Sequence, residues 1–234
     1  MFSGGKRVRR FSPWLDRTTA RIHDARMRKL FLPGYGASGR LYARGLAAGW
    51  RALEPPPFHA TEGAFRAYEQ WLGVELRRSE EPAWLAGHSM GGALAVVGAV
   101  AHPSRVARLT LISPAGLPLR KPIPTSLAQF VKQVALGRYE LGEIGHDLRH
   151  ALRSPRAAYR LAQAVRGLDL TEHMRKLGEL GVPAEVVACT SDTLVTPVHC
   201  RRAAELLGGE YRELALAGGH MWMLDSWPQL AKLL

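Results

Sequence analysis

The sequence predicts an α/β protein in which a mainly parallel sheet of about six strands is covered by helices on both faces. Short apolar segments with strand character alternate with segments of helical spacing over residues 29–113 and again over 179–234. Strands that alternate with helices favour parallel pairing, because each helix returns the chain to the same edge of the sheet. The segment 90–102 is almost entirely apolar, so the helix expected there should be buried.

The predicted elements are bounded by residues that favour turns or helix ends. Pro33-Gly34 follows the first strand, and Ser38 and Gly49 are typical of the beginning and the end of a helix. In chain order, we expect strands within residues 29–34, 50–57, 82–87, 106–113, 183–189 and 211–216, and helices within residues 38–49, 63–79, 90–102, 199–207 and 225–234.

Residues 115–178 interrupt this alternation. They contain helical stretches such as 126–135 and 155–166 and no clear strand, and they are too many for an ordinary loop. Insertions of this length are often lids over an active site. We therefore expect three parts, which are a basic arm and helix at 1–28, an α/β core at 29–114 and 179–234, and a helical cap at 115–178.

The net charge of +12 is concentrated in the arm and in the insertion. Residues 115–178 offer only Phe130, Tyr139 and Tyr159 as aromatic residues and contain no nucleic-acid-binding motif, so we expect no nucleic-acid partner. A solvated basic face explains the charge, and weak contact with an anionic membrane or an anionic ligand is the alternative. The helix expected near Ser12-Pro13 either packs on the body or lies at such a membrane.

The cellular location of the protein and the state of its cysteines can be predicted from the composition of the sequence. No apolar run approaches the ~18 residues that span a bilayer, and the first residues lack the apolar core of a signal peptide, so we expect a cytoplasmic protein. The two cysteines, Cys189 and Cys200, are too few for a disulfide framework and are not spaced like zinc ligands.

A serine between two glycines lies where the strand at 82–87 meets the helix at 90–102. The segment LAGHSMGGALAVV places Ser89 two residues after Gly87 and two before Gly91. Gly-x-Ser-x-Gly at a strand-to-helix turn is typical of a nucleophile elbow, where a strained turn presents the serine and only small neighbours fit. The alternative is a tight turn with a solvated hydroxyl.

With this elbow the chain resembles the α/β-hydrolase superfamily over residues 29–113 and 179–234. A serine hydroxyl needs a base to take its proton and a third group to orient that base, and the family order is serine, acid, histidine. Asp192 follows a late strand and His220 follows the last one. The resemblance therefore implies a catalytic triad of Ser89, Asp192 and His220.

Other histidines and acids fit these roles less well. They lie in the insertion, at a predicted helix start or in the last helix: His146, His150, His173 and Asp169, then His199, then Asp225. The strand that ends at Ile112 is followed by Ser113-Pro114 and offers no carboxylate.

The resemblance also implies an oxyanion hole made by the backbone N–H groups of Met90 and Tyr35. Many family members carry His-Gly where this chain has Pro33-Gly34, but the donors are backbone groups, so the difference does not remove them. Candidate pocket residues lie beside the triad or in the insertion: Gly36, His88, Leu127, Phe130, Val131, Met221 and Trp222. A structural role is the alternative for His88, and packing of the cap for the apolar residues of the insertion.

The function implied by the resemblance is hydrolysis of a carboxylic ester through an acyl-Ser89 intermediate, by an esterase more than a lipase. The partner would be a small acyl substrate, with no metal or organic cofactor. Serine at the elbow excludes haloalkane dehalogenases and epoxide hydrolases, which use aspartate there. The alternatives are a thioesterase, an acyltransferase or a hydrolase of ring-cleavage products with the same triad, and a non-catalytic binding protein, against which the intact triad argues.

Overall fold

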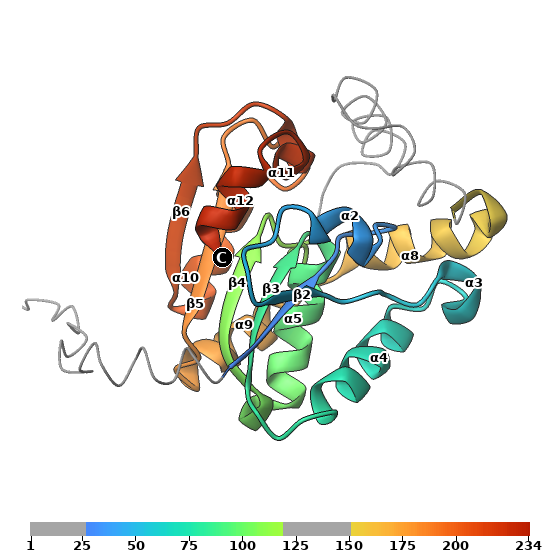
Figure 1. The fold of residues 1–234 in the computed structure, drawn as a ribbon, viewed down its shortest axis with the longest axis horizontal. Helices are drawn as coiled ribbons and strands as arrows, with labels where there is room; N and C mark the ends of the chain where they lie inside the picture. The colour runs from blue at the N-terminus through green and yellow to red at the C-terminus, as the bar shows by residue number, and fades with distance from the viewer. Residues whose placement is uncertain (1–26, 119–150) are drawn as a thin grey trace, which may run out of the picture.

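A six-stranded parallel sheet forms the centre of the protein (Figure 1). The structure is a computed structural model that describes residues 27–118 and 151–234. The strand order across the sheet is β2-β1-β3-β4-β5-β6, as expected for strands joined by helices. The strands are β1 (Arg28–Leu32), β2 (Trp50–Ala52), β3 (Ala83–His88), β4 (Val106–Ile112), β5 (Ala184–Cys189) and β6 (Glu210–Leu214). The predicted fold class is confirmed.

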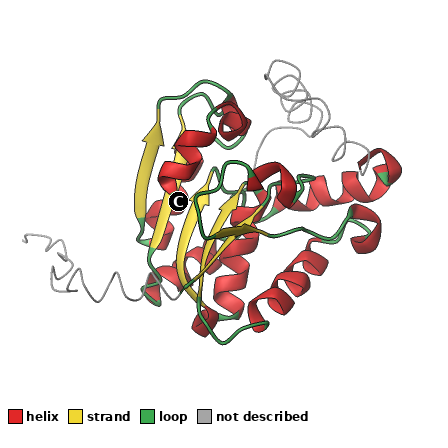
Figure 2. Ribbon diagram, viewed as in Figure 1, coloured by secondary structure: helices red, strands yellow, loops and turns green. Residues whose placement is uncertain are grey.

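Helices cover both faces of this sheet (Figure 2). One face packs against α4 (Phe65–Arg77), α5 (Met90–Ala101), α9 (Thr171–Glu179) and α10 (Pro197–Leu207), and α8 (Pro155–Gly167) packs against α4. The other packs against α2 (Gly39–Ala43), α11 (Trp222–Asp225) and α12 (Trp227–Leu233). The short helices α3 (Phe58–Thr61), η1 (Pro103–Arg105) and η2 (Gly219–Met221) lie in connections.

Alternate strand residues contribute to two separate cores. In β1, Leu30 and Leu32 join the core beneath α4 and α5, whereas Phe31 joins the core beneath α2 and α12. This follows from the two-residue period of a strand. Helix α5 is buried along most of its length, as its apolar sequence predicts, because it lies between the sheet, α4 and α9.

The parallel register places four chain segments at one edge of the sheet. β1 runs into Pro33, β3 into Ser89, and β5 and β6 into the loops that carry Asp192 and His220. In open α/β sheets, ligands bind at the carboxyl ends of the strands, so this edge is where a functional site is expected.

Parts of the predicted organisation lie outside the described residues, including most of the arm at 1–28 and residues 119–150 of the insertion. Within the insertion, α9 packs against α5 and α10, and its Met174 and Leu177 side chains are fully buried. Helix α9 thus belongs to the layer that covers the sheet, and the division of the chain into core and cap stays a prediction.

The helices differ from the prediction in two places. The helix expected over 38–49 ends at Ala43, and the helix expected over 225–234 is α12, which is preceded by a separate short helix, α11, that the sequence analysis does not expect. Across residues 27–118 and 151–234, no helix is both long enough and apolar enough to cross a membrane.

Candidate active site

Ser89 occupies a strained turn between β3 and α5. Its φ of 53° and ψ of −116° lie outside the regions that side-chain-bearing residues normally adopt. A Cβ atom on Gly87 would lie 2.4 Å from the Gly91 carbonyl oxygen, and one on Gly91 would lie 2.1 Å from the Leu32 carbonyl oxygen. Backbone of neighbouring segments therefore fills the space on both sides of the serine, which is the arrangement of a nucleophile elbow.

Replacement of Gly91 by alanine should destabilise the protein severely. The new methyl group would meet backbone atoms of Leu32 and Pro33, which cannot rotate away as a side chain could. We expect a loss of about 3 kcal/mol or more in the free energy of unfolding, measured by urea denaturation. The control is Gly167→Ala in α8, where nothing lies within 4 Å of the added atom, so stability should hold or rise slightly. Equal stabilities of the two variants would contradict this account of the elbow.

Asp192 and His220 form a buried hydrogen-bonded pair beside the elbow. The Nδ1 atom of His220 lies 2.8 Å from Asp192 Oδ2, and both side chains are almost fully buried. Because a carboxylate only accepts, Nδ1 carries the hydrogen of this contact, and Nε2 is left as the ring nitrogen that can act as a base. The other carboxylate oxygen, Oδ1, accepts from the N–H groups of Leu194 (2.9 Å) and Val195 (3.0 Å).

These contacts keep Asp192 ionised. Burial alone raises the pKa of this carboxyl group, but its electrostatic interaction and hydrogen bond with His220 and the hydrogen bond from the Leu194 N–H outweigh burial, so the pKa lies below its ordinary value. The nearby Ser113 hydroxyl acts in the same direction, although its buried Oγ forms no hydrogen bond of normal geometry with a described residue. An ionised, fixed carboxylate is what the orientation of an imidazole base requires.

Ser191 braces the loop that carries His220, a role that the sequence does not reveal. Its hydroxyl donates to the Leu216 carbonyl oxygen (2.7 Å) and accepts from the Gly219 N–H (3.0 Å). The two loops at the ends of β5 and β6 are therefore joined next to the Asp192–His220 pair. The only sequence signal is a hydroxyl residue one position before the acid.

The amides predicted to form the oxyanion hole lie at the ends of β1 and β3. Within the described part of the chain, neither the Met90 N–H nor the Tyr35 N–H donates a backbone hydrogen bond. An oxyanion hole requires amides that no other group of the protein occupies, so the assignment of these two amides stays a prediction. The Tyr35 side chain reaches away to α8, where its hydroxyl donates to the Ala158 carbonyl oxygen at 2.7 Å. The loop after β1 is thereby anchored to a helix 123 residues further along the chain.

The anchor predicts a moderate effect of Tyr35→Phe. Without the hydroxyl, the Ala158 carbonyl loses a donor, and we expect about 1 kcal/mol lower stability and a roughly three- to tenfold lower kcat with little change in KM. Urea denaturation measures the change in stability, and steady-state kinetics measures the changes in kcat and KM. The control is Tyr159→Phe, one residue further along α8, whose exposed hydroxyl contacts only Gln163 among the contacts described. A Tyr35→Phe variant as active as Tyr159→Phe would show that the anchor does not affect the loop.

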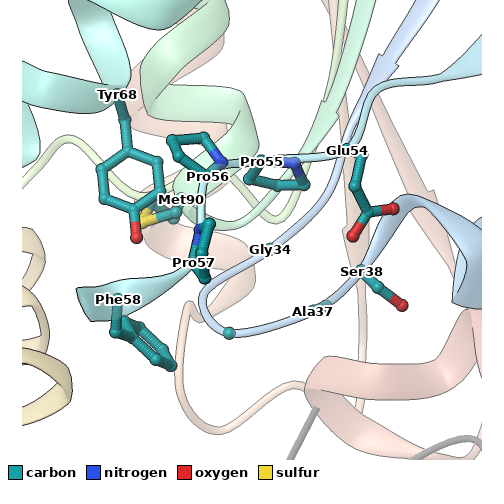
Figure 3. Close-up of a pocket in the computed structure, with 11 residues that line it drawn as sticks. Gly34, Ala37, Ser38, Glu54, Pro55, Pro56, Pro57, Phe58, Tyr68 and Met90 are labelled. Carbon is teal, nitrogen blue, oxygen red and sulfur yellow. The ribbon is translucent and has the colours of Figure 1, made fainter. Parts of the chain in front are cut away.

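A cavity of about 240 Å³ opens next to the loop after β1 (Figure 3). Its apolar lining comes from the loop after β1, the proline segment before α3, α4 and the start of α5: Gly34, Gly36, Pro57, Phe58, Tyr68 and Met90. Ser38 and Glu54 lie at the opposite end from Tyr68 and Met90. A cavity lined mainly by apolar groups can take up an apolar part of a ligand.

The residues that the sequence analysis proposed for a substrate pocket do not all lie at the cavity. Gly36 lines the cavity, and Met221 and Trp222 are buried, with Trp222 in the core beneath α2 and α12. His88 is buried and contacts Tyr42 and the main chain of His220. Leu127, Phe130 and Val131 lie outside the described residues. Among the described residues, no group of three or more His, Cys, Asp or Glu side chains could hold a metal ion.

A parallel sheet with a strained serine after β3 and an Asp–His pair after β5 and β6 defines the α/β-hydrolase class. A family model described as the alpha/beta hydrolase family matches residues 13–233. The chain therefore belongs to the α/β-hydrolase family, a family of hydrolases. No curated protein matches its sequence.

Solved structures share the fold at low sequence identity. A thermophilic esterase is 19% identical with a TM-score of 0.68, over 88% of this chain and 86% of that chain. An N-acyl homoserine lactone degrading enzyme is 18% identical with a TM-score of 0.67, over 88% and 91%. The thioesterase domain from the curacin biosynthetic pathway is 20% identical with a TM-score of 0.57, over 87% and 88%. These similarities establish the common fold.

Proposed function

We propose that this hydrolase cleaves a carboxylic ester through an acyl intermediate on Ser89, with His220 as general base and acid and Asp192 as the group that orients His220. The observation that carries the proposal is the buried 2.8 Å contact between Asp192 and His220 at the sheet edge where Ser89 sits in a strained turn. A merely structural Asp–His pair would not need a neighbouring serine with positive φ.

The reaction proceeds in two halves. Ser89 Oγ attacks the ester carbonyl carbon while His220 Nε2 takes the hydroxyl proton, and the carbonyl oxygen becomes an oxyanion facing the Met90 and Tyr35 amides. His220 then gives the proton to the departing alkoxide, which leaves as an alcohol. Water next attacks acyl-Ser89, His220 takes the water proton and returns it to Ser89 Oγ, and the carboxylic acid departs.

The size of the cavity favours an esterase over a lipase. Its volume of about 240 Å³ is below the roughly 300–1,000 Å³ of typical ligand sites, and its wall of Pro57, Phe58 and Tyr68 is apolar. Such a cavity suits a short acyl chain. A thioester with the same acyl group would present the same carbonyl to Ser89, so the leaving group must be tested directly.

A panel of substrates tests the proposal. Purified protein is given nitrophenyl esters from acetate to dodecanoate, and acyl-CoA thioesters with the same acyl chains. We expect ester hydrolysis with kcat/KM highest for short chains, because a long chain exceeds the cavity. Activity on the thioesters alone would overturn the preference for esters, and a maximum at dodecanoate would overturn the preference for an esterase.

A further inference from the structure

His88 is a buried titratable residue that the proposed acyl transfer does not use. It is the last residue of β3, directly before Ser89, and is 1% exposed. Its Nδ1 atom lies 2.7 Å from the Tyr42 hydroxyl oxygen, and its Nε2 atom lies 3.0 Å from the main-chain oxygen of His220. A side chain of the elbow therefore contacts the backbone of the residue proposed as the general base.

These two partners determine which ring nitrogen carries the hydrogen. A carbonyl oxygen only accepts, so Nε2 must be the donor to His220. A neutral imidazole has one N–H group, so Nδ1 is an acceptor, and the Tyr42 hydroxyl donates to it. The hydrogen bonds then run in one direction, from Tyr42 to His88 and from His88 to the His220 carbonyl.

The surroundings keep His88 neutral. Burial, reinforced by the neighbouring His220, lowers the pKa of His88 to about 3, while Asp192 and the bond to the His220 carbonyl act weakly the other way. Tyr42 is fully buried and packs against Phe31 and Trp227, so the donor to Nδ1 is held in place. The ring therefore keeps one charge state and one tautomer across the pH range in which an imidazole base works.

The backbone at His220 needs such an anchor. His220 lies in the 3₁₀ turn η2, after Gly218 and Gly219, whose φ values of 97° and 60° place both in conformations that glycine adopts easily. The Asp192 carboxylate accepts a hydrogen bond from the His220 ring, and the Ser191 hydroxyl accepts one from the Gly219 N–H. His88 forms a hydrogen bond with the main-chain carbonyl of His220. The centroids of the two histidine rings are 4.7 Å apart.

The imidazole ring of His88 also packs closely against the loop after β1, which carries Gly34 and Tyr35. A Cβ atom on Gly34 would lie 2.9 Å from His88 Nδ1 and 3.5 Å from Ser89 Cβ. The Gly34 backbone thus packs directly against the imidazole, next to Tyr35. His88 contacts both the loop proposed to bind the oxyanion and the turn proposed to supply the base.

We propose that His88 is a positioning residue, which donates from Nε2 to the His220 carbonyl and so fixes the main chain that carries the base, with Tyr42 selecting the required tautomer. The proposal rests on the proposed function of Ser89, Asp192 and His220. It assigns His88 no contact with substrate.

Two substitutions separate the two hydrogen bonds of His88. The amide nitrogen of glutamine can take the place of Nε2 and donate to His220, whereas the shorter asparagine reaches only the position of Nδ1 and the Tyr42 hydroxyl. We expect His88→Asn to lower kcat about ten- to hundredfold with KM within about twofold, because a small displacement of the base costs this much. His88→Gln should restore kcat to within about threefold. Equal losses in both variants, or a change confined to KM, would overturn the proposal.

Nitrogen and proton NMR spectra provide a readout that does not depend on activity. In the wild type, His88 should show the neutral Nε2–H tautomer from pH 5 to 9, and the His220 Nδ1–H signal should be protected from exchange in the wild type and His88→Gln but not in His88→Asn. An Nδ1–H tautomer, or titration of His88 in this range, would overturn the proposal even if a variant fails to fold. If the wild type hydrolyses no ester or thioester, the proposed function fails, and the NMR result still decides the role of His88.

Discussion

Replacement of Ser89 by alanine should abolish ester hydrolysis. Because the attacking oxygen is removed, we expect kcat to fall by about 10⁴-fold or more, as when the nucleophile of a triad is deleted in serine hydrolases generally. A fluorophosphonate probe, which forms a covalent bond with an activated serine, should label the wild type and leave Ser89→Ala unlabelled. Mass spectrometry of the labelled protein should place the modification on Ser89.

The matched control is Ser79→Ala. Ser79 lies after α4, and its Oγ accepts a hydrogen bond from the Glu81 N–H. This variant should keep the activity and labelling of the wild type. Probe labelling that persists in Ser89→Ala, or a wild type that is not labelled at all, would show that Ser89 is not the nucleophile.

Asp192→Asn should be almost as damaging, with a loss of about 10⁴-fold in kcat and little change in fold. The asparagine can turn its NH₂ group toward Nδ1 of His220, which then accepts a hydrogen bond and places the ring hydrogen on Nε2. In that tautomer the ring cannot take the Ser89 proton. Steady-state kinetics on the best nitrophenyl ester and the rate of fluorophosphonate labelling measure the loss.

The control is Asp169→Asn, which removes the same charge at an exposed position away from His220. Asp169 is exposed, and its Oδ1 accepts a hydrogen bond from the Thr171 N–H, a role that an asparagine oxygen can also fill. Its activity should equal that of the wild type. A wild-type kcat in Asp192→Asn would refute the assignment of Asp192, since an uncharged side chain would then orient the base equally well.

The lowered pKa of Asp192 also predicts how the stability of the protein changes with pH. The folded carboxyl group releases its proton more readily than it does in the unfolded chain, where the pKa is about 3.9. Its stabilising contribution is therefore complete above about pH 4 and is lost as the pH falls through the lower pKa of the folded state. The difference in free energy of unfolding between wild type and Asp192→Asn should narrow below pH 4. A difference that widens there would contradict the lowered pKa.

Local patterns in the sequence were sufficient to predict most of the fold. The strands at 83–88 and 106–112 and the buried helix α5 have strong apolar patterns with clear boundaries, so local preference and tertiary packing agree. The short α3 was missed because it follows three prolines, which favour an extended chain. The helix expected within 225–234 is confirmed as α12, but the short α11 before it was missed, because the apolar run around it was not assigned to any element.

For the site, the sequence determined the types of group and their order along the chain. Gly87, Ser89 and Gly91 identify the elbow, and the positions of Asp192 and His220 after late strands follow from the family order. These features are readable because a strained turn and a parallel sheet impose them locally, through residue type and spacing.

Only the tertiary structure determined how these groups are held. The contacts of His88 with Tyr42 and His220, and of Tyr35 with Ala158, join residues 46, 132 and 123 positions apart. No local pattern encodes such contacts, because hydrogen bonds between distant segments depend on the packing of the whole sheet and its helices. The sequence thus indicates which residues are candidates for the chemistry, and the fold determines which neighbouring groups hold them in position.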